Sequence, residues 1–183
     1  MRLTKLEKTV KVIIIDDELS DVLALKEFLE DRDVEVHYFS DLDTGTEAIA
    51  DSLIEGPYSA IICDNHFHDS GLVDYDPNFS GADLMRILSG ASEDEYRSFV
   101  NAYFGDDLQR MIDTYSGRLI MFSGSAYTEA LDLSSRLEVV QKFPDRKGVC
   151  CESGVLDALE RIGVELDVRD DSDLESYKQG IDF

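Results

Sequence analysis

The chain of 183 residues is short of cationic side chains and of long apolar runs. Its 17 Lys and Arg residues stand against 40 Asp and Glu residues, which leaves a formal net charge of −23. Phosphate backbones and anionic membranes repel a surface of that charge, so nucleic-acid and lipid binding are not expected. No apolar run approaches the ~20 residues that span a bilayer, and the run after the basic stretch 1–11 is too short for a signal peptide. We therefore expect no membrane insertion.

Cysteine is also scarce, with Cys63, Cys150 and Cys151 making an odd set of three. This set fits neither a disulfide framework nor a zinc site that would need a second cysteine pair. Reduced thiols are the expected state, which indicates a cytoplasmic protein. At the usual ~100–200 residues per domain, the length predicts a single domain.

The sequence does contain short apolar runs that alternate with helical patterns. Runs at residues 10–16, 34–39, 58–63, 118–122 and 137–141 predict five strands. Helical spacing follows several of them, with a capping box expected at Thr44 and Glu47 and further helices over 127–135 and 155–162. This alternation predicts an α/β fold, a doubly wound parallel sheet with helices on both faces.

The interval between the third and fourth predicted strands is too long for one crossover helix. Helical patterns open in it at Ser80, at Ser92 and at Asp106 or Asp107. We expect residues 90–116 to form an inserted helical hairpin inside a domain spanning 1–163. Residues 164–183 are expected to be an acidic tail or an extra edge element, and no output domain is expected.

The predicted hairpin carries an aromatic stripe, which consists of Tyr96, Phe99, Tyr103 and Phe104. We interpret the stripe as the hairpin's own core. A docking surface for a partner is the alternative.

Polar side chains stand where the predicted strands end. They are Asp16 and Asp17, Asp64, Ser123 and Lys142. Because ligands of open α/β sheets bind at the carboxyl ends of the strands, these three carboxylates, one hydroxyl and one ammonium are expected to converge. For Asp16 and Asp17, simple capping of the first helix is the alternative.

Such a cluster has a definite chemistry. Packed carboxylates resist ionisation unless a cation neutralises them, and hard oxygen ligands suit Mg²⁺. A carboxylate can also act as a nucleophile and form an aspartyl phosphate, while lysine and serine bind phosphoryl oxygens. The residues thus predict a phosphoryl-transfer site. His66 and His68 with Asp69 are interpreted as polar loop residues, with a transition-metal site as the alternative.

On these residues the chain resembles the receiver (response regulator, CheY-like) domain of two-component signalling. The resemblance rests on segments 12–18, 60–64, 121–124 and 139–142, and it covers roughly residues 11–162 apart from the insertion. It implies a flavodoxin-like, five-stranded sheet of order 2-1-3-4-5, with the helical insertion between strands 3 and 4.

The resemblance also implies roles for the site residues. Asp64 would be the phosphoacceptor, and Mg²⁺ would be bound by Asp16, Asp17, Asp64 and the backbone carbonyl of His66. Phosphoryl binding and switching would fall to Ser123, Gly124 and Lys142. These roles imply a phosphoprotein of phosphorelay signal transduction, not an enzyme with an independent substrate. Its partners would be a histidine kinase or phosphotransfer protein and a downstream protein target, and a homodimer is left open.

Two departures from the family pattern favour an alternative. Pro144 stands one place later than the usual Lys-Pro pair after Lys142, and Val139 occupies the position of the usual switch aromatic. The alternative is a degenerate receiver that acts as a phosphorylation-independent interaction module. A Mg²⁺-dependent phosphohydrolase with Asp64 as nucleophile is a further alternative, although residues 16–18 do not match the Asp-x-Asp pattern of haloacid-dehalogenase-type enzymes.

Overall fold

The computed structural model describes residues 9–68, 79–91, 96–124, 137–142 and 151–166. The strands in these ranges are β1 (Lys11–Ile15), β2 (Glu35–Phe39), β3 (Ala60–Cys63), β4 (Leu119–Ser123) and β5 (Glu138–Gln141). They pair in parallel in the order β2-β1-β3-β4-β5. The predicted α/β class and the flavodoxin-like strand order are confirmed.

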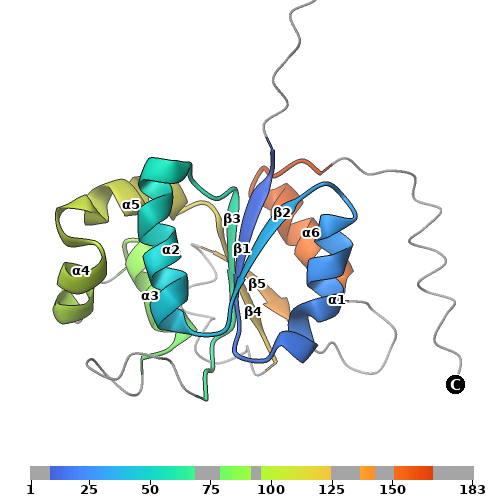
Figure 1. Ribbon diagram of the computed structural model, residues 1–183, viewed down its shortest axis with the longest axis horizontal. Coiled ribbons are helices and arrows are strands. Elements are labelled where there is room, and N and C mark those ends of the chain that lie inside the picture. The colour runs from blue at the N-terminus through green and yellow to red at the C-terminus, as the bar shows by residue number, and fades with distance from the viewer. Residues whose placement is uncertain (1–8, 69–78, 92–95, 125–136, 143–150, 167–183) are drawn as a thin grey trace, which may run out of the picture.

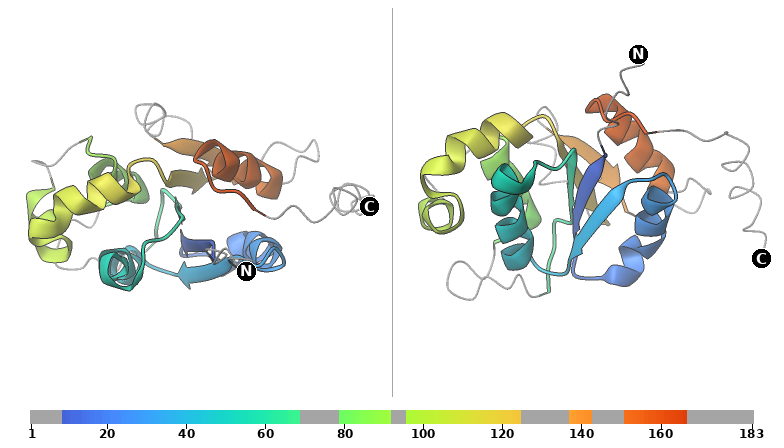
Figure 2. Two further views of the ribbon diagram at one scale, coloured as in Figure 1. Left: turned by 90° about the horizontal axis from the view of Figure 1, so that it is seen from above. Right: turned by 45° about the horizontal axis from the view of Figure 1, so that its top comes forward.

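Helices cover both faces of the sheet. Helices α1 (Leu19–Glu30) and α6 (Cys151–Arg161) lie on one side, and α2 (Leu42–Glu55) and α3 (Gly81–Leu88) lie on the other (Figure 1). Between β3 and β4, the chain also forms α4 (Arg97–Tyr103), the 3₁₀ turn η1 (Gly105–Asp107) and α5 (Leu108–Tyr115). Both views in Figure 2 place α4 and α5 on the side of the sheet away from α1 and α6. The helical insertion between strands 3 and 4 is therefore confirmed.

The strands are apolar along their length because both faces of the sheet are covered. Alternate residues point to opposite faces, so β1 places Ile13 and Ile15 in one core and Val12 and Ile14 in the other. All four are fully buried, as is Cys63 at the end of β3. None of the helices in the described residues is long and apolar enough to cross a membrane.

The aromatic stripe of the insertion is a core, but it is shared with the sheet. Phe99 stacks on Phe79, which precedes α3, with 4.2 Å between ring centroids. Phe99 and Phe104 are buried in the same apolar cluster as Ile13, and the Tyr103 hydroxyl donates to the Asp43 carboxylate of α2. The prediction of a separate hairpin core is corrected accordingly, because each short helix alone has too little apolar surface to bury.

Two helix boundaries differ from the predictions. Helix α2 begins before Thr44, because Asp41 is the N-cap and its Oδ1 accepts the Thr44 N–H over 2.8 Å. Aspartate is the stronger cap next to the positive end of the helix dipole, so the capping box at Thr44 was wrong. Helix α6 begins at Cys151, four residues before the predicted start.

Several predictions fall outside the described residues. They are the helix over 127–135, the helix start at Ser92, the loop residues 69–78, the geometry of Pro144, and the tail beyond residue 166. Before that point, Val164 is buried in the core under α1 and α6.

Candidate functional site

The predicted carboxylates do meet at the carboxyl end of the sheet. The hydrogen bonds between the strands continue one residue past the ends of β1 and β3. The Asp16 N–H donates to the Phe39 carbonyl over 3.0 Å, and the Asp64 N–H donates to the Ile15 carbonyl over 2.9 Å. These bonds fix Asp16 and Asp64 side by side, one after β1 and one after β3. Asp16, Asp17 and Asp64 each offer a carboxylate oxygen, and the three atoms lie within 4.8 Å of one another. Asp16 and Asp17 therefore do more than cap the first helix, because both belong to this carboxylate cluster.

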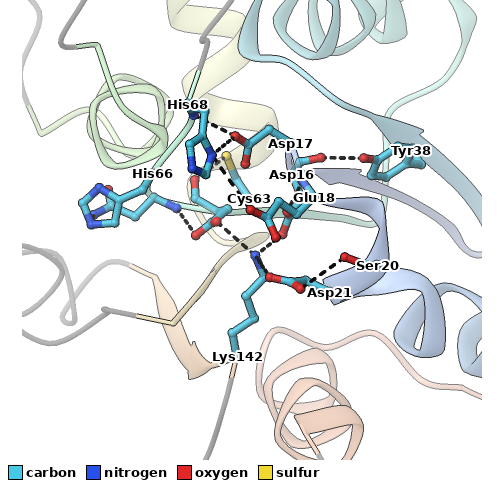
Figure 3. Close-up of polar contacts among 12 residues, drawn as sticks. Asp16, Asp17, Glu18, Ser20, Asp21, Tyr38, Cys63, His66, His68 and Lys142 are labelled. Carbon is cyan, nitrogen blue, oxygen red and sulfur yellow. Dashed lines mark hydrogen bonds and ion pairs between the residues drawn. The ribbon is translucent and has the colours of Figure 1, made fainter.

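Lys142, directly after β5, reaches into this cluster (Figure 3). Its backbone N–H donates to the Ser123 carbonyl over 3.1 Å, which places it beside the end of β4. Its Nζ lies 2.8 Å from Asp16 Oδ2 and 3.1 Å from Asp64 Oδ2. A third carboxylate, Asp21 Oδ2, lies 3.2 Å away. The Lys142 side chain is only 4% exposed, so these are interior ion pairs.

Asp21 also belongs to the site, although no sequence pattern marks it as functional. It lies in the first turn of α1, where an acidic residue is ordinary because of the helix dipole. Only the position of α1 against the sheet brings its carboxylate to Lys142.

The protein's own charges do not balance at this site. Three carboxylates, those of Asp16, Asp21 and Asp64, contact the Lys142 ammonium, and Asp17 lies beside Asp16 and Asp64 and pairs with His68, so acidic groups outnumber cations here among the described residues. Burial raises the pKa of Asp16 to about 6, although the Lys142 ammonium and the Glu18 N–H act to lower it. Burial by itself would lower the pKa of Lys142, but its pairs with Asp16 and Asp64 outweigh burial and raise it. Lys142 therefore stays charged, and the excess charge is negative.

A hard divalent cation fits this arrangement. The donor set consists of carboxylate oxygens that converge on one point, and no thiolate or imidazole belongs to this cluster within the part of the chain described. Oxygen ligands of this kind, with room for water or phosphate oxygens, are what Mg²⁺ prefers.

The two loop histidines do not act together. The His66 ring points away from the carboxylates (Figure 3), and its Nε2 lies 3.1 Å from Asn65 Nδ2. His68 instead contacts Asp17 Oδ2 twice, through its backbone N–H at 2.7 Å and its Nδ1 at 2.9 Å. Partial burial works to raise the pKa of Asp17, but the contacts with His68 outweigh it and lower that pKa. Asp17 in turn raises the pKa of His68.

Two further residues of the site, Asn65 and Gly81, were missed. The Asn65 N–H donates to Asp64 Oδ1 over 2.6 Å, and the Asn65 carbonyl accepts the Gly81 N–H over 3.0 Å. A Cβ atom at Gly81 would lie 1.7 Å from the Asp64 carbonyl oxygen, so only glycine fits there. Asn65 followed directly on Asp64 in the sequence, and Gly81 followed the Ser80 cap, but nothing local linked the two positions.

The remaining predicted residues lie at the ends of β4 and β5. Ser123 is the last residue of β4, is 1% exposed and pairs in register with Gln141, while Gly124 follows it exposed at the surface. Val139 pairs with Met121 and is partly buried against the same core as the insertion.

No family model matches the chain, and no curated protein matches it. Among solved structures, the bacteriophytochrome response regulator AtBRR is similar at a TM-score of 0.53 and 15% identity, over 86% of this chain and 95% of that one. A CheY-like response regulator receiver domain from Methylobacillus flagellatus matches at a TM-score of 0.50 and 16% identity, over 85% and 99% of the two chains. A structure named as adenylate cyclase from Rhodopirellula baltica matches at a TM-score of 0.50 and 14% identity, over 85% and 90%.

At these identities the similarity concerns the fold. The third match shows that the same fold occurs in a protein named for an enzymatic activity, so activity has to be argued from the site. The chain has the five-stranded, flavodoxin-like fold of response regulator receiver domains.

Proposed function

We propose that this protein is a phosphorylatable receiver in which Asp64 accepts a phosphoryl group with the help of Mg²⁺. The donor would be a histidine kinase, a phosphotransfer protein or a small phosphodonor, and the product would signal through contacts with a downstream protein. The single observation that carries the proposal is the convergence of Asp16, Asp17 and Asp64 within 4.8 Å, with Lys142 Nζ 3.1 Å from Asp64 Oδ2.

The chemistry follows from the properties of Asp64. It is 7% exposed, and it lies at the carboxyl end of the sheet, where ligands of this fold bind. One carboxylate oxygen attacks the phosphorus atom, so that an O–P bond forms while the bond from phosphorus to the donor breaks. The leaving group departs with that electron pair, and an acyl phosphate remains on Asp64. Lys142 stays charged and neutralises part of the negative charge on the transferred oxygens.

We assign the metal to Asp16, Asp17 and Asp64, together with the backbone carbonyl of His66. The cation would supply charge neutralisation between these carboxylates and the phosphoryl oxygens. Ser123 and Gly124 at the end of β4 would hydrogen-bond the phosphoryl group. We assign the receiver unit to residues 1–163, with residues 90–116 as its insertion and 164–183 as an acidic tail or an extra edge element, acting in the cytoplasm.

The test is intact-mass measurement after incubation with acetyl phosphate and Mg²⁺. Wild type is expected to gain one phosphoryl group, and the gain should disappear in Asp64→Asn and in a metal-free sample. Asp51→Asn, an exposed acid on α2, is the matched control and should be phosphorylated like wild type. Failure of wild type to gain the group and to bind beryllofluoride would contradict the proposal.

Val139 favours a second candidate function, a degenerate receiver that binds partners without phosphorylation. A valine lacks the ring and hydroxyl with which an aromatic residue follows a switch serine, and Val139 is partly buried against the core. This candidate predicts that partner binding is the same for wild type and Asp64→Asn. Sustained turnover of a phosphoester would instead indicate a phosphohydrolase.

A further inference from the structure

Each oxygen of the Asp64 carboxylate has a polar partner. Lys142 Nζ donates to Oδ2 over 3.1 Å, and the Asn65 backbone N–H donates to Oδ1 over 2.6 Å. Lys142 belongs to the charge cluster of the site. Asn65, which is 5% exposed, contacts the first turn of α3 as well as Asp64.

Asn65 holds the first turn of α3. Its backbone carbonyl accepts the Gly81 N–H over 3.0 Å, and its side-chain Oδ1 accepts the Ala82 N–H over 3.2 Å. A helix leaves the N–H groups of its first turn without partners inside the helix, and Asn65 satisfies two of them here. One buried residue therefore contacts both the candidate phosphoacceptor and the start of α3.

The contact between α3 and the end of β3 is also direct. A Cβ atom at Gly81 would lie 1.7 Å from the Asp64 carbonyl oxygen and 2.9 Å from Cys63 Sγ. The helix thus begins against the Asp64 backbone with no space for a side chain between them. Such close packing passes a displacement of one partner to the other, because packed interiors do not compress.

The contacts continue from α3 to the inserted helices. Asp83 lies in the first turn of α3, and its Oδ1 accepts a hydrogen bond from the Tyr96 hydroxyl over 2.6 Å. Tyr96 is the residue just before α4. Phe79, two residues before α3, stacks on Phe99 of α4 at 4.2 Å between ring centroids. A polar and an aromatic contact therefore join α4 to the helix that Asn65 holds.

We infer that Asn65 is a positioning residue through which α3 and α4 respond to the state of Asp64, so that the inserted helices form the surface that reports phosphorylation. The inference rests on the proposed function, because it needs an acyl phosphate on Asp64. Bond formation at either oxygen removes the charge of the carboxylate. At Oδ2 the new bond displaces the contact with Lys142, and at Oδ1 it displaces the contact with the Asn65 N–H. Either change alters the attraction on the Asn65 N–H, and Asn65 cannot shift without the first turn of α3.

The experiment is hydrogen exchange with mass spectrometry on the full chain, with and without beryllofluoride and Mg²⁺. Intact mass after acetyl phosphate treatment reports separately whether Asp64 is modified. In wild type, amides within 81–103 are expected to change their exchange rate by at least about fivefold, the lower end of typical couplings between sites. Asn65→Ala keeps the backbone N–H on Asp64 and the backbone carbonyl that accepts from Gly81, but it removes the acceptor for Ala82, so this response should become smaller than in wild type. Asn65→Asp keeps that acceptor and should retain the response; a merely structural role predicts instead that a folded Asn65→Ala responds to beryllofluoride as wild type does.

The outcomes separate the two proposals. If wild type gains the phosphoryl group and exchange within 81–103 stays unchanged, the inference is overturned and the proposed function stands. The same holds if Asn65→Ala responds as wild type does. If wild type neither gains the group nor binds beryllofluoride, the proposed function and the inference both fail. Circular dichroism checks that each variant is folded. Gly117→Ala lies between α5 and β4, where a Cβ would meet nothing within 4 Å, and is the control for a substitution away from Asn65.

Discussion

Replacing Asp16 by Asn in the metal-free protein is expected to increase its stability at neutral pH. The Asp16 carboxyl is fully buried, and burial raises its pKa from 3.8 to about 6 despite the neighbouring Lys142 ammonium. The native state therefore holds the proton of Asp16 more tightly than the unfolded chain does. At neutral pH the group must ionise in an environment that disfavours its charge, and a neutral amide of the same shape avoids that cost.

The size of the effect follows from the pKa difference. A shift of one unit corresponds to 1.36 kcal/mol, so a rise of about two units amounts to about 3 kcal/mol in the free energy of unfolding. Below pH 4 the carboxyl is protonated in both states and costs nothing. Between pH 4 and 6 the stability of wild type falls as the pH rises, because the unfolded chain releases the proton first. Above pH 6 the full cost is present, so the advantage of Asp16→Asn should grow from pH 4 to 6 and then level off.

The assay is urea unfolding followed by circular dichroism in EDTA, at pH values from 4.5 to 8. Asp51→Asn removes an exposed acid and should change the free energy of unfolding by less than about 0.5 kcal/mol. Addition of Mg²⁺ should stabilise wild type more than Asp16→Asn, because a ligand that binds only the native state raises its stability. If Asp16→Asn is less stable than wild type at pH 7.5 in EDTA, Lys142 already compensates the carboxylate and the argument for a cation is wrong.

Three further predictions concern other residues of the site. Lys142→Met leaves buried carboxylates without their cation, so metal-free stability at pH 7.5 should fall by about 3–5 kcal/mol in urea unfolding, and Mg²⁺ should recover part of it. Gly81→Ala forces a Cβ atom to 1.7 Å from a backbone oxygen, so it should lower the free energy of unfolding by about 2 kcal/mol or more and lower the melting temperature accordingly. Gly117→Ala should be close to neutral. His68→Ala frees Asp17 from a competing side chain, so calorimetry should find Mg²⁺ binding about two- to fivefold tighter. That gain should be larger at pH 6 than at pH 8, because the pKa of His68 is raised and its charge is lost as the pH increases through that pKa; equal gains at both pH values would contradict the reasoning.

The sheet could be predicted because its signal is local. A run such as residues 11–15 is apolar at every position, which only a strand covered on both faces tolerates. The polar residues that stop these runs then fall at one edge, since parallel strands end on the same side of the sheet. Asp16, Asp64 and Lys142 were found in this way, and the structure brings all three into contact.

Other parts of the site left no local pattern. Asp21 is an ordinary first-turn acid until α1 packs beside the sheet, and His68 reads as a loop residue until its segment folds back over Asp17. The helix start at Asp41 was missed for a different reason, since Asp41 and Thr44 are both good caps and the choice depends on where the chain leaves β2.

The sequence by itself determined the α/β class, the carboxylate edge and the presence of a helical insertion, because periodicity and strand ends are properties of neighbouring residues. Only the tertiary structure decided that the insertion shares the main core through Phe79 and Phe99, and that Asn65 joins Asp64 to the first turn of α3. These contacts depend on the directions in which helices leave the sheet. Those directions are set by packing over the whole domain, and short stretches of sequence do not encode them.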